Sequence, residues 1–206
     1  MGMKSLKALI DSMIVSEILR SPEIIDAFQS VDRKYFVPMS KWEHAYVDVP
    51  LSIGKDQTIS QPSTVAFMLE LLQVKHGDTV LDIGSGSGWT TALLCHLAGE
   101  SGKIIGLERI DELVVQGRKN LSSFTEQSNC SIVKAGDKLG LPGQLFDKIL
   151  VSASAEEIPE SLFLQLKVGG ILVMPIGKSI VKFKKVSETY IEKETFYGFV
   201  FVPLIV

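Results

Sequence analysis

The sequence has only two cysteines and three histidines among its 206 residues, and this scarcity excludes several classes of protein. Cys95 and Cys130 belong to no CxxC pair and to no Cys/His ligand cluster, which argues against a disulfide scaffold and a structural zinc site. We expect both to be buried core thiols in a reducing compartment. His44, His76 and His96 are scattered without an HExxH-like spacing, so we predict no bound metal.

The sequence also lacks a basic excess, since 21 Lys and Arg stand against 24 Asp and Glu, with a net charge of −3 and a pI near 5.7. Proteins that bind nucleic acid usually carry a positive patch, so we predict no nucleic-acid partner. No apolar run reaches the roughly 20 residues of a membrane span. The most apolar segment, FYGFVFVPLIV, is too short, and charged residues interrupt the N-terminal segment, unlike a signal peptide. We expect a cytoplasmic monomer without a membrane partner.

The hydrophobic content of 46% is sufficient for one sizeable core, and the length fits a single domain spanning residues 1–206. Within it we expect an N-terminal segment at 1–62, an α/β core at 63–177 and edge strands at 178–206. Residues 3–31 have the apolar spacing of one or two amphipathic helices. Ser21 and Pro22 suit the N-cap and first position of the second helix.

From residue 63 onward, short apolar segments alternate with helical ones. Strands are predicted at 79–83, 103–107, 130–135, 146–154 and 170–176, and helices at 63–73, 89–98, 111–123 and near 159–166. This alternation is typical of an α/β fold in which helices cover both faces of a mostly parallel sheet. The segments 181–186 and 190–204 are predicted to add antiparallel strands at one edge.

The strongest local pattern is VLDIGSGSGW at residues 80–89. Gly84, Gly86 and Gly88 follow a predicted strand and precede a predicted helix, where main chain can approach a ligand closely. Trp89 occupies the position where a dinucleotide-binding loop needs a small residue for packing of the helix on the strand. The pattern therefore disfavours a nicotinamide or flavin site.

Two acidic residues accompany this loop. Glu108 comes 24 residues after Gly84, at the carboxyl end of the next predicted strand, where it can bind the ribose hydroxyls of an adenosine group. Asp82 precedes the loop and can face a cationic amine. Together they suggest S-adenosylmethionine as the cofactor, the alternative being a structural glycine turn with two surface acids.

The sequence resembles the protein-L-isoaspartate O-methyltransferase family from about residue 31 to residue 204. Its most specific mark is QTISQP, and the segments that carry the resemblance are VDRKYFVP (31–38), AYVDVPLSIGKDQTISQP (45–62), VLDIGSGSGW (80–89), AGD (135–137), EIPESLFLQLKVGGILVMPIG (157–177) and FVPL (201–204).

The resemblance implies a Rossmann-like methyltransferase that moves a methyl group from S-adenosylmethionine to the free α-carboxylate of L-isoaspartyl residues in damaged proteins and peptides, leaving S-adenosylhomocysteine. The ester closes to a succinimide, whose hydrolysis returns some normal aspartate, so the reaction begins repair. Residues 1–62 would cover the substrate and cofactor. The implied site consists of Ser60 as catalytic residue and, for the cofactor, Gln57, Thr58, Ile59, Asp82, Gly84, Ser85, Gly86, Ser87, Gly88, Glu108, Arg109, Asp137 and Lys138.

Ser60 need not be a nucleophile in such a reaction. A carboxylate acceptor with a pKa near ~4 is already ionised at neutral pH, so no general base is required. We expect the Ser60 hydroxyl to hydrogen-bond and orient that carboxylate. The structural alternative is that Ser60 caps the helix beginning near Ser63, and both roles could coexist.

Three features depart from the family pattern. Lys138 replaces the second glycine of a GDG segment, Ser154 and Glu156 make the segment 151–159 more polar, and the sequence ends at Val206, beyond which family members often continue over the site. These departures motivate two alternatives: a carboxyl methyltransferase directed at another peptide or small molecule, and a non-catalytic S-adenosylmethionine-binding module.

Two further groups have structural and functional interpretations. Trp42, His44 and Tyr46 could shape a peptide groove or form an ordinary aromatic cluster. Lys182, Lys184 and Lys185 could attract acidic peptides, but we expect them mainly on the solvated side of an edge strand.

Overall fold

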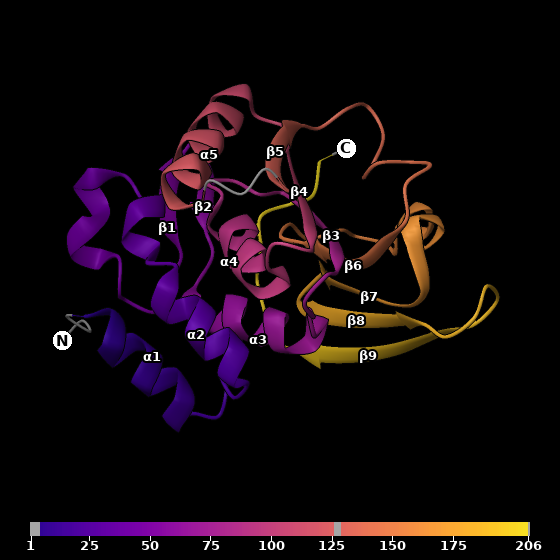
Figure 1. Cartoon of the computed structure of the whole chain (residues 1–206), viewed down its shortest axis with the longest axis horizontal. Coiled ribbons are helices and arrows are strands. Elements are labelled where there is room, and N and C mark those ends of the chain that lie inside the picture. Colours follow the sequence, from indigo (N-terminus) through magenta and orange to yellow (C-terminus); the bar gives the residue numbers. More distant parts are fainter. Residues whose placement is uncertain (1–4, 126–128, 206) are drawn as a thin grey trace.

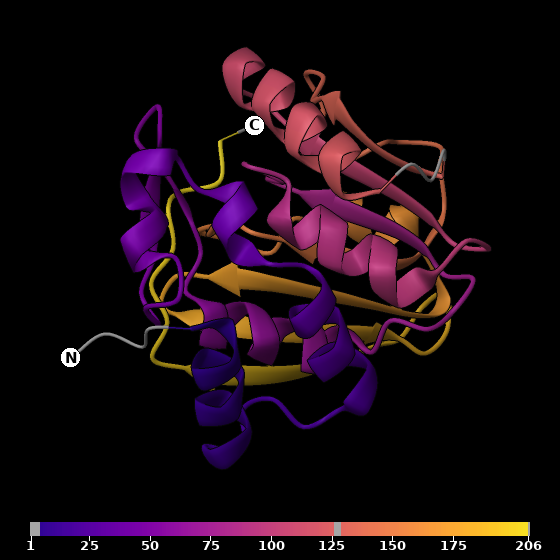
Figure 2. The same cartoon turned by 60° about the vertical axis from the view of Figure 1, so that its left-hand side comes forward.

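The computed structural model describes residues 5–125 and 129–205, which form one large sheet, one small sheet and a set of helices (Figures 1 and 2). The large sheet has seven strands in the order β5-β4-β3-β6-β7-β8-β9. Its strands are β3 (Thr79–Ile83), β4 (Lys103–Glu108), β5 (Cys130–Lys134), β6 (Phe146–Val151), β7 (Leu166–Ile176), β8 (Ser179–Lys185) and β9 (Ile191–Tyr197).

The first five strands of this order pair in parallel, and β8 and β9 continue the sheet antiparallel to β7. The predicted mostly parallel sheet with an antiparallel C-terminal edge is therefore confirmed. The chain first builds outward from β3 to β4 and β5, then returns to place β6 on the other side of β3. Such a reversal opens a crevice at the carboxyl ends of the central strands, where α/β proteins bind ligands.

The two faces of the sheet are covered differently. Side chains alternate along each strand, so that Val80 belongs to one hydrophobic cluster and Leu81 to the other. The cluster around Val80 includes residues of helices α1 to α5. The opposite cluster is closed by the 3-10 helix η3 (Glu160–Gln165) and by loops, in the region where a helix was predicted near 159–166. The helices over the first face are α3 (Pro62–Leu72), α4 (Trp89–Ala98) and α5 (Asp111–Phe124).

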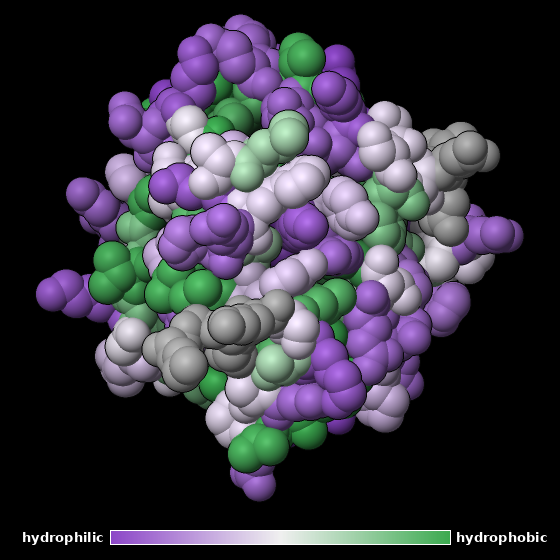
Figure 3. All heavy atoms as spheres, turned by 90° about the vertical axis from the view of Figure 1, so that its left-hand side faces the viewer, coloured by the Kyte–Doolittle hydropathy of each residue, from purple (hydrophilic) through white to green (hydrophobic). Residues whose placement is uncertain are grey.

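The N-terminal segment packs on the same face as α4 and contains six short elements. They are α1 (Leu6–Val15), α2 (Pro22–Ser30), η1 (Arg33–Phe36), η2 (Met39–His44), β1 (Leu51–Gly54) and β2 (Gln57–Ile59). Trp89 joins this segment to the core, because its ring meets Phe28 edge-on at 5.5 Å and its indole N–H donates to the Val31 carbonyl at 3.2 Å. The outer surface of the segment mixes hydrophilic and hydrophobic side chains, as expected of amphipathic helices (Figure 3).

The structure corrects one detail of the predicted N-terminal helices. Pro22 begins α2 and Ser21 precedes it, but the Ser21 hydroxyl does not cap the helix. It donates instead to Glu70 of α3 at 2.6 Å, and the Ser21 main-chain N–H donates to the same carboxylate at 2.7 Å. A partner 49 residues away cannot be inferred from helical spacing. Residues 3 and 4 of the predicted helical stretch lie outside the described residues.

The prediction of two free cysteines is wrong. Cys95 near the end of α4 and Cys130 at the start of β5 form a disulfide, with their Cα atoms 6.1 Å apart. Their separation of 35 residues gives no indication of pairing, which results from the contact between α4 and β5. The cysteines therefore do not support the expectation of a reducing compartment.

Lys185 also differs from its prediction as a solvated edge-strand residue. Its side chain is buried, and its ammonium donates to the carbonyls of Phe163 and Leu166 at 3.3 and 3.0 Å and pairs with Glu188. Because η3 lies over this end of β8, the lysine is enclosed by a segment distant in sequence. None of the helices in the described ranges has the length and apolarity needed to cross a bilayer.

Candidate active site

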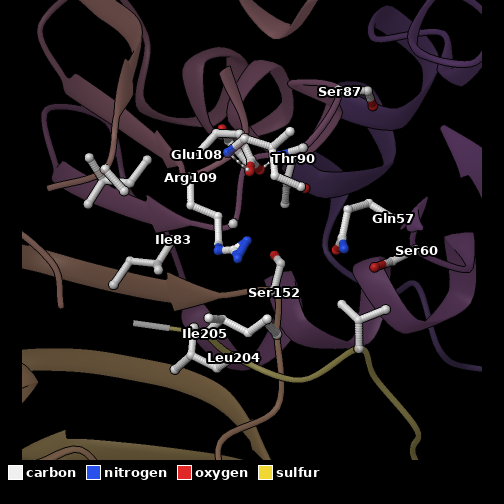
Figure 4. A pocket seen from close by; sticks show the side chains of 18 of the residues that line it. Gln57, Ser60, Ile83, Ser87, Thr90, Glu108, Arg109, Ser152, Leu204 and Ile205 are labelled. Carbon is white, nitrogen blue, oxygen red and sulfur yellow. Dashed lines mark hydrogen bonds between the residues drawn. The ribbon is translucent and has the colours of Figure 1, made fainter. Parts of the chain in front are cut away.

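A cavity lies at the carboxyl ends of β3, β4 and β6, the crevice that the strand order predicts (Figure 4). Six segments that are far apart in sequence form its walls. The lining residues include Ile53, Gln57 to Ser60, Ile83 to Ser87, Trp89, Thr90, Leu107 to Ile110, Ala135, Gly136, Lys138 to Gly140, Ser152, Ala153 and Val202 to Ile205.

The glycine loop after β3 forms the floor of the cavity, and Gly84, Gly86 and Gly88 all have positive φ. At Gly88 a Cβ atom would lie 3.0 Å from the Gly117 carbonyl oxygen and from Cδ1 of Ile132. This position therefore requires glycine both for its conformation and for the close approach of α5.

Glu108 at the end of β4 holds the loop in place. One carboxylate oxygen accepts from the Gly86 main-chain N–H and the other from that of Ile110, both at 2.9 Å. The side chain is only 6% exposed, yet it lines the cavity. Each oxygen has a second lone pair, so the carboxylate can also accept from two adjacent hydroxyl groups of a ligand.

The hairpin formed by β1 and β2 covers the loop from the other side. A Cβ atom at Gly86 would lie 3.3 Å from Cδ1 of Ile53, so the hairpin and the loop are in close contact. Lys55 in the turn of the hairpin pairs with Glu112 in the first turn of α5. Gln57, Thr58 and Ile59, predicted to bind the cofactor, all line the cavity.

Ser60 lies on the cavity wall directly after β2, and its side chain points toward the cavity beside Gln57 (Figure 4). Within the described part of the chain its hydroxyl has no hydrogen-bond partner. The capping alternative is wrong, because α3 is capped by Asp48, whose carboxylate accepts from the Ser63 N–H at 2.9 Å and from the Gln61 amide at 3.1 Å. The Ser60 hydroxyl is thus available to a ligand.

Eleven of the fourteen predicted site residues line the cavity, and Asp82, Gly88 and Asp137 do not. Asp82 is fully buried beneath the loop, where it accepts from the Thr91 hydroxyl at 2.6 Å. Burial raises its pKa to about 7, opposed by the Thr91 hydrogen bond and aided by the nearby Glu108. Its other oxygen has no partner among the described residues.

Sequence reasoning missed two parts of the wall. Ser152 and Ala153 follow β6, and their position at the carboxyl end of a parallel strand is the signal that could have found them. Residues 202–205 form the second part. The segment is held by Ser154, whose N–H donates to the Val202 carbonyl and whose carbonyl accepts from the Leu204 N–H, both at 2.8 Å.

The aromatic residues before β1 do not line the cavity. The Tyr46 hydroxyl donates to Asp32 at 2.9 Å, and its pKa is raised to about 12 by burial and by this carboxylate. The Trp42 ring is covered by the Lys34 ammonium at 4.6 Å from its centroid. These contacts favour the packing interpretation, and a groove at Trp42, His44 and Tyr46 stays a prediction. No group of three or more His, Cys, Asp or Glu side chains in residues 5–125 and 129–205 could hold a metal ion.

The mostly parallel sheet with its reversal of strand order, the glycine loop and the acidic residue at the end of β4 together define a nucleoside-binding protein of Rossmann-like architecture. The family model for protein-L-isoaspartate(D-aspartate) O-methyltransferase matches residues 4–206, and the chain belongs to this family.

Individual relatives of known sequence and structure agree with the family match. A protein-L-isoaspartate O-methyltransferase of Ignicoccus hospitalis is 38% identical over 204 residues, covering 97% of this chain and 96% of that protein. One from Fervidobacterium nodosum is 45% identical over 174 residues, covering 84% and 87%. Among solved structures, a candidate enzyme of the same name from Plasmodium falciparum, in complex with S-adenosyl-L-homocysteine, superimposes with a TM-score of 0.87 at 27% identity, covering 98% of this chain and 99% of that one.

Proposed function

We propose that the protein transfers a methyl group from S-adenosylmethionine to the free α-carboxylate of L-isoaspartyl residues in damaged proteins and peptides, which begins their repair through a succinimide. The observation that carries this proposal is the unpartnered Ser60 hydroxyl in the cavity wall of a chain that belongs to this family. It is a free hydrogen-bond donor on the cavity wall that can receive an incoming carboxylate.

The residues of the cavity fit the cofactor. Glu108 has lone pairs free for the two ribose hydroxyls, and glycine at position 86 keeps the floor open beside Ile53. The Ser85 hydroxyl lines the cavity and has no partner among the described residues, so a polar ligand group would satisfy it. Gln57, Thr58, Ile59, Arg109 and Lys138 would form the remaining polar and apolar walls.

The chemistry asks little of the protein beyond position and exclusion of water. S-adenosylmethionine, when bound, supplies a methyl group that its sulfonium charge makes electrophilic. The acceptor carboxylate is already ionised at neutral pH, so Ser60 need only donate a hydrogen bond that fixes the direction of approach. The hairpin and residues 202–205 narrow the access of water to the cavity.

The direct test is transfer of labelled methyl from S-adenosylmethionine to an isoaspartyl peptide, beside the same peptide with normal aspartate. We expect a base-labile ester on the isoaspartyl peptide alone. Ser60→Ala should lower kcat/KM about 10- to 100-fold, the effect of losing one hydrogen bond to a charged group. Ser123→Ala, which removes an exposed hydroxyl of α5, is the matched control and should leave kcat/KM unchanged.

Two other outcomes would replace this function with the alternatives. Equal transfer to isoaspartyl and aspartyl peptides would indicate a carboxyl methyltransferase directed at another acceptor, which the lysine at cavity position 138 favours. Tight cofactor binding without transfer to either peptide would indicate a non-catalytic binding module. Full activity of Ser60→Ala would refute the role of its hydroxyl while leaving the function itself intact.

The finer details of partners and location are also proposals. We infer a monomer that acts in the cytoplasm without nucleic acid. The acidic charge balance of the chain supports the last of these points. Light scattering coupled to size-exclusion chromatography tests the first point, since a mass near 22.6 kDa is expected. The division of the domain at residues 62 and 177 likewise stays a prediction.

A further inference from the structure

Arg33 is a charged residue whose side chain is completely buried in the N-terminal segment. One terminal nitrogen donates to the Ala45 carbonyl at 2.9 Å, and the other donates to the carbonyls of Val49 and Ser60, each at 3.0 Å. Longer contacts reach the carbonyls of Val47 at 3.4 Å and Ile59 at 3.5 Å. A single guanidinium therefore gathers the main chain of residues 45–60.

The Arg33 guanidinium donates to main-chain carbonyls rather than to a carboxylate. Arg33 forms no ion pair with any acidic residue in the described ranges, and the acid that acts on it electrostatically is Asp48. Burial lowers the pKa of Arg33 to about 10, with Asp48 opposing the shift, so the side chain remains cationic at neutral pH. A buried charge is costly unless its donors are satisfied, and here peptide oxygens accept from both terminal nitrogens, while the buried Nε has no partner among the described residues.

The contacts of Arg33 lie on two sides of the cavity. Its guanidinium carbon is 5.5 Å from the centre of the Trp89 ring, and Trp89 directly follows the last glycine of the loop. Ser60 is thus held through its own carbonyl by Arg33, while Asp48 holds Gln61 and Ser63 immediately after it. The main chain on both sides of Ser60 is held in place, which sets the direction in which its side chain leaves the main chain.

We propose that Arg33 is a positioning residue for methyl transfer, which fixes the main chain of Ser60 against Trp89 and so aims the Ser60 hydroxyl into the cavity. The inference rests on the proposed function and on the role of Ser60 in it. Lysine cannot replace arginine here, because one ammonium group cannot span the carbonyls of Ala45, Val49 and Ser60 as a planar fork does.

The test uses Arg33→Lys, Ser60→Ala and the double variant in the isoaspartyl assay. We expect Arg33→Lys to lower kcat about 10- to 100-fold, the size of effect that misplacement by about 1 Å produces. The dissociation constant of S-adenosylhomocysteine should rise by a smaller factor than kcat falls, because Glu108 and the glycine loop are untouched and only Gln57 to Ile59 lie in the loosened segment. The double variant should be no slower than Ser60→Ala, since Arg33 acts through Ser60. Losses that multiply, or an unchanged kcat in Arg33→Lys, would overturn the proposal.

Amide hydrogen exchange gives a second readout that is independent of the acceptor. Arg33→Lys should lose protection in residues 45–61 and keep it in β3 to β7. Lys185→Met is the control for disturbing a buried cation, and its effect should be confined to the region of η3 and β8. Unchanged exchange in residues 45–61 would refute the inference. If the wild-type protein methylates no isoaspartyl peptide, the proposed function and the catalytic part of this inference fail, while the exchange result still decides whether Arg33 holds the main chain of residues 45–61.

Discussion

Glu108→Gln should weaken cofactor binding and loosen the glycine loop together, because the carboxylate serves both. Each of its oxygens accepts a main-chain N–H at 2.9 Å, so an amide must turn its NH2 group toward either Gly86 N–H or Ile110 N–H. That places donor against donor and removes the charge from the remaining hydrogen bonds. A hydrogen bond to a charged group contributes roughly 1.5–3 kcal/mol, so we expect a comparable loss in the free energy of unfolding.

Glu108→Gln also removes the charged acceptor for the ribose hydroxyls. The dissociation constant of S-adenosylhomocysteine should therefore rise roughly 10- to 150-fold, which corresponds to the same 1.5–3 kcal/mol. Isothermal titration calorimetry measures the binding, and urea unfolding without ligand measures the stability. Glu194→Gln, at an exposed carboxylate paired with Lys182 on the edge strands, is the matched control. A dissociation constant within about twofold of wild type for Glu108→Gln would refute the assignment.

Three further predictions concern the loop, the buried acid and the disulfide. Gly88→Ala should lower the free energy of unfolding in urea by about 2–5 kcal/mol, because of the positive φ and the tight contacts of the added Cβ. Gly169→Ala, at φ +85° with nothing within 4 Å of the added Cβ, should lower it by only about 1–2 kcal/mol. Equal losses would contradict the packing argument. In the folded protein the pKa of Asp82 is raised to about 7, so ionising this buried carboxyl lowers the free energy of unfolding. This cost is absent below the unfolded pKa and complete above pH 7, so Asp82→Asn should gain stability over wild type as pH rises from 4 to 7, by roughly 4 kcal/mol at most. Parallel pH profiles of the two proteins would exclude this. Reduction of Cys95–Cys130 should lower the free energy of unfolding by roughly 4 kcal/mol for a separation of 35 residues, and titration of two free thiols in the folded, unreduced protein would disprove the bond.

The sequence was most informative where local pattern and burial agree. The limits of β3 and α4 match the predicted ranges, because a short apolar segment or a helix between glycines has few alternatives. The position of Ser60 in the cavity wall was also predictable, although from the resemblance carried by QTISQP rather than from periodicity.

The wrong predictions for capping and cysteine pairing involve partners distant in sequence. Asp48 rather than Ser60 caps α3, the Ser21 hydroxyl donates to Glu70, and Cys95 of α4 bonds to Cys130 of β5, 35 residues later. In each case the local sequence offers a plausible short-range role, and tertiary contact replaces it with a more favourable one. Such contacts depend on how the elements assemble, which a linear pattern does not encode.

The wall formed by residues 202–205 links cofactor binding to a segment far from the glycine loop in sequence. The glycine loop forms the floor of the cavity, and residues 202–205 form one side of it through their hydrogen bonds to Ser154. A partly folded form in which this segment has separated from Ser154 should therefore bind the methyl donor less tightly than the native form. Because a ligand that binds only the native state adds about 2.7 kcal/mol at 100 times its dissociation constant, the methyl donor itself would favour the fully assembled enzyme over its incomplete forms.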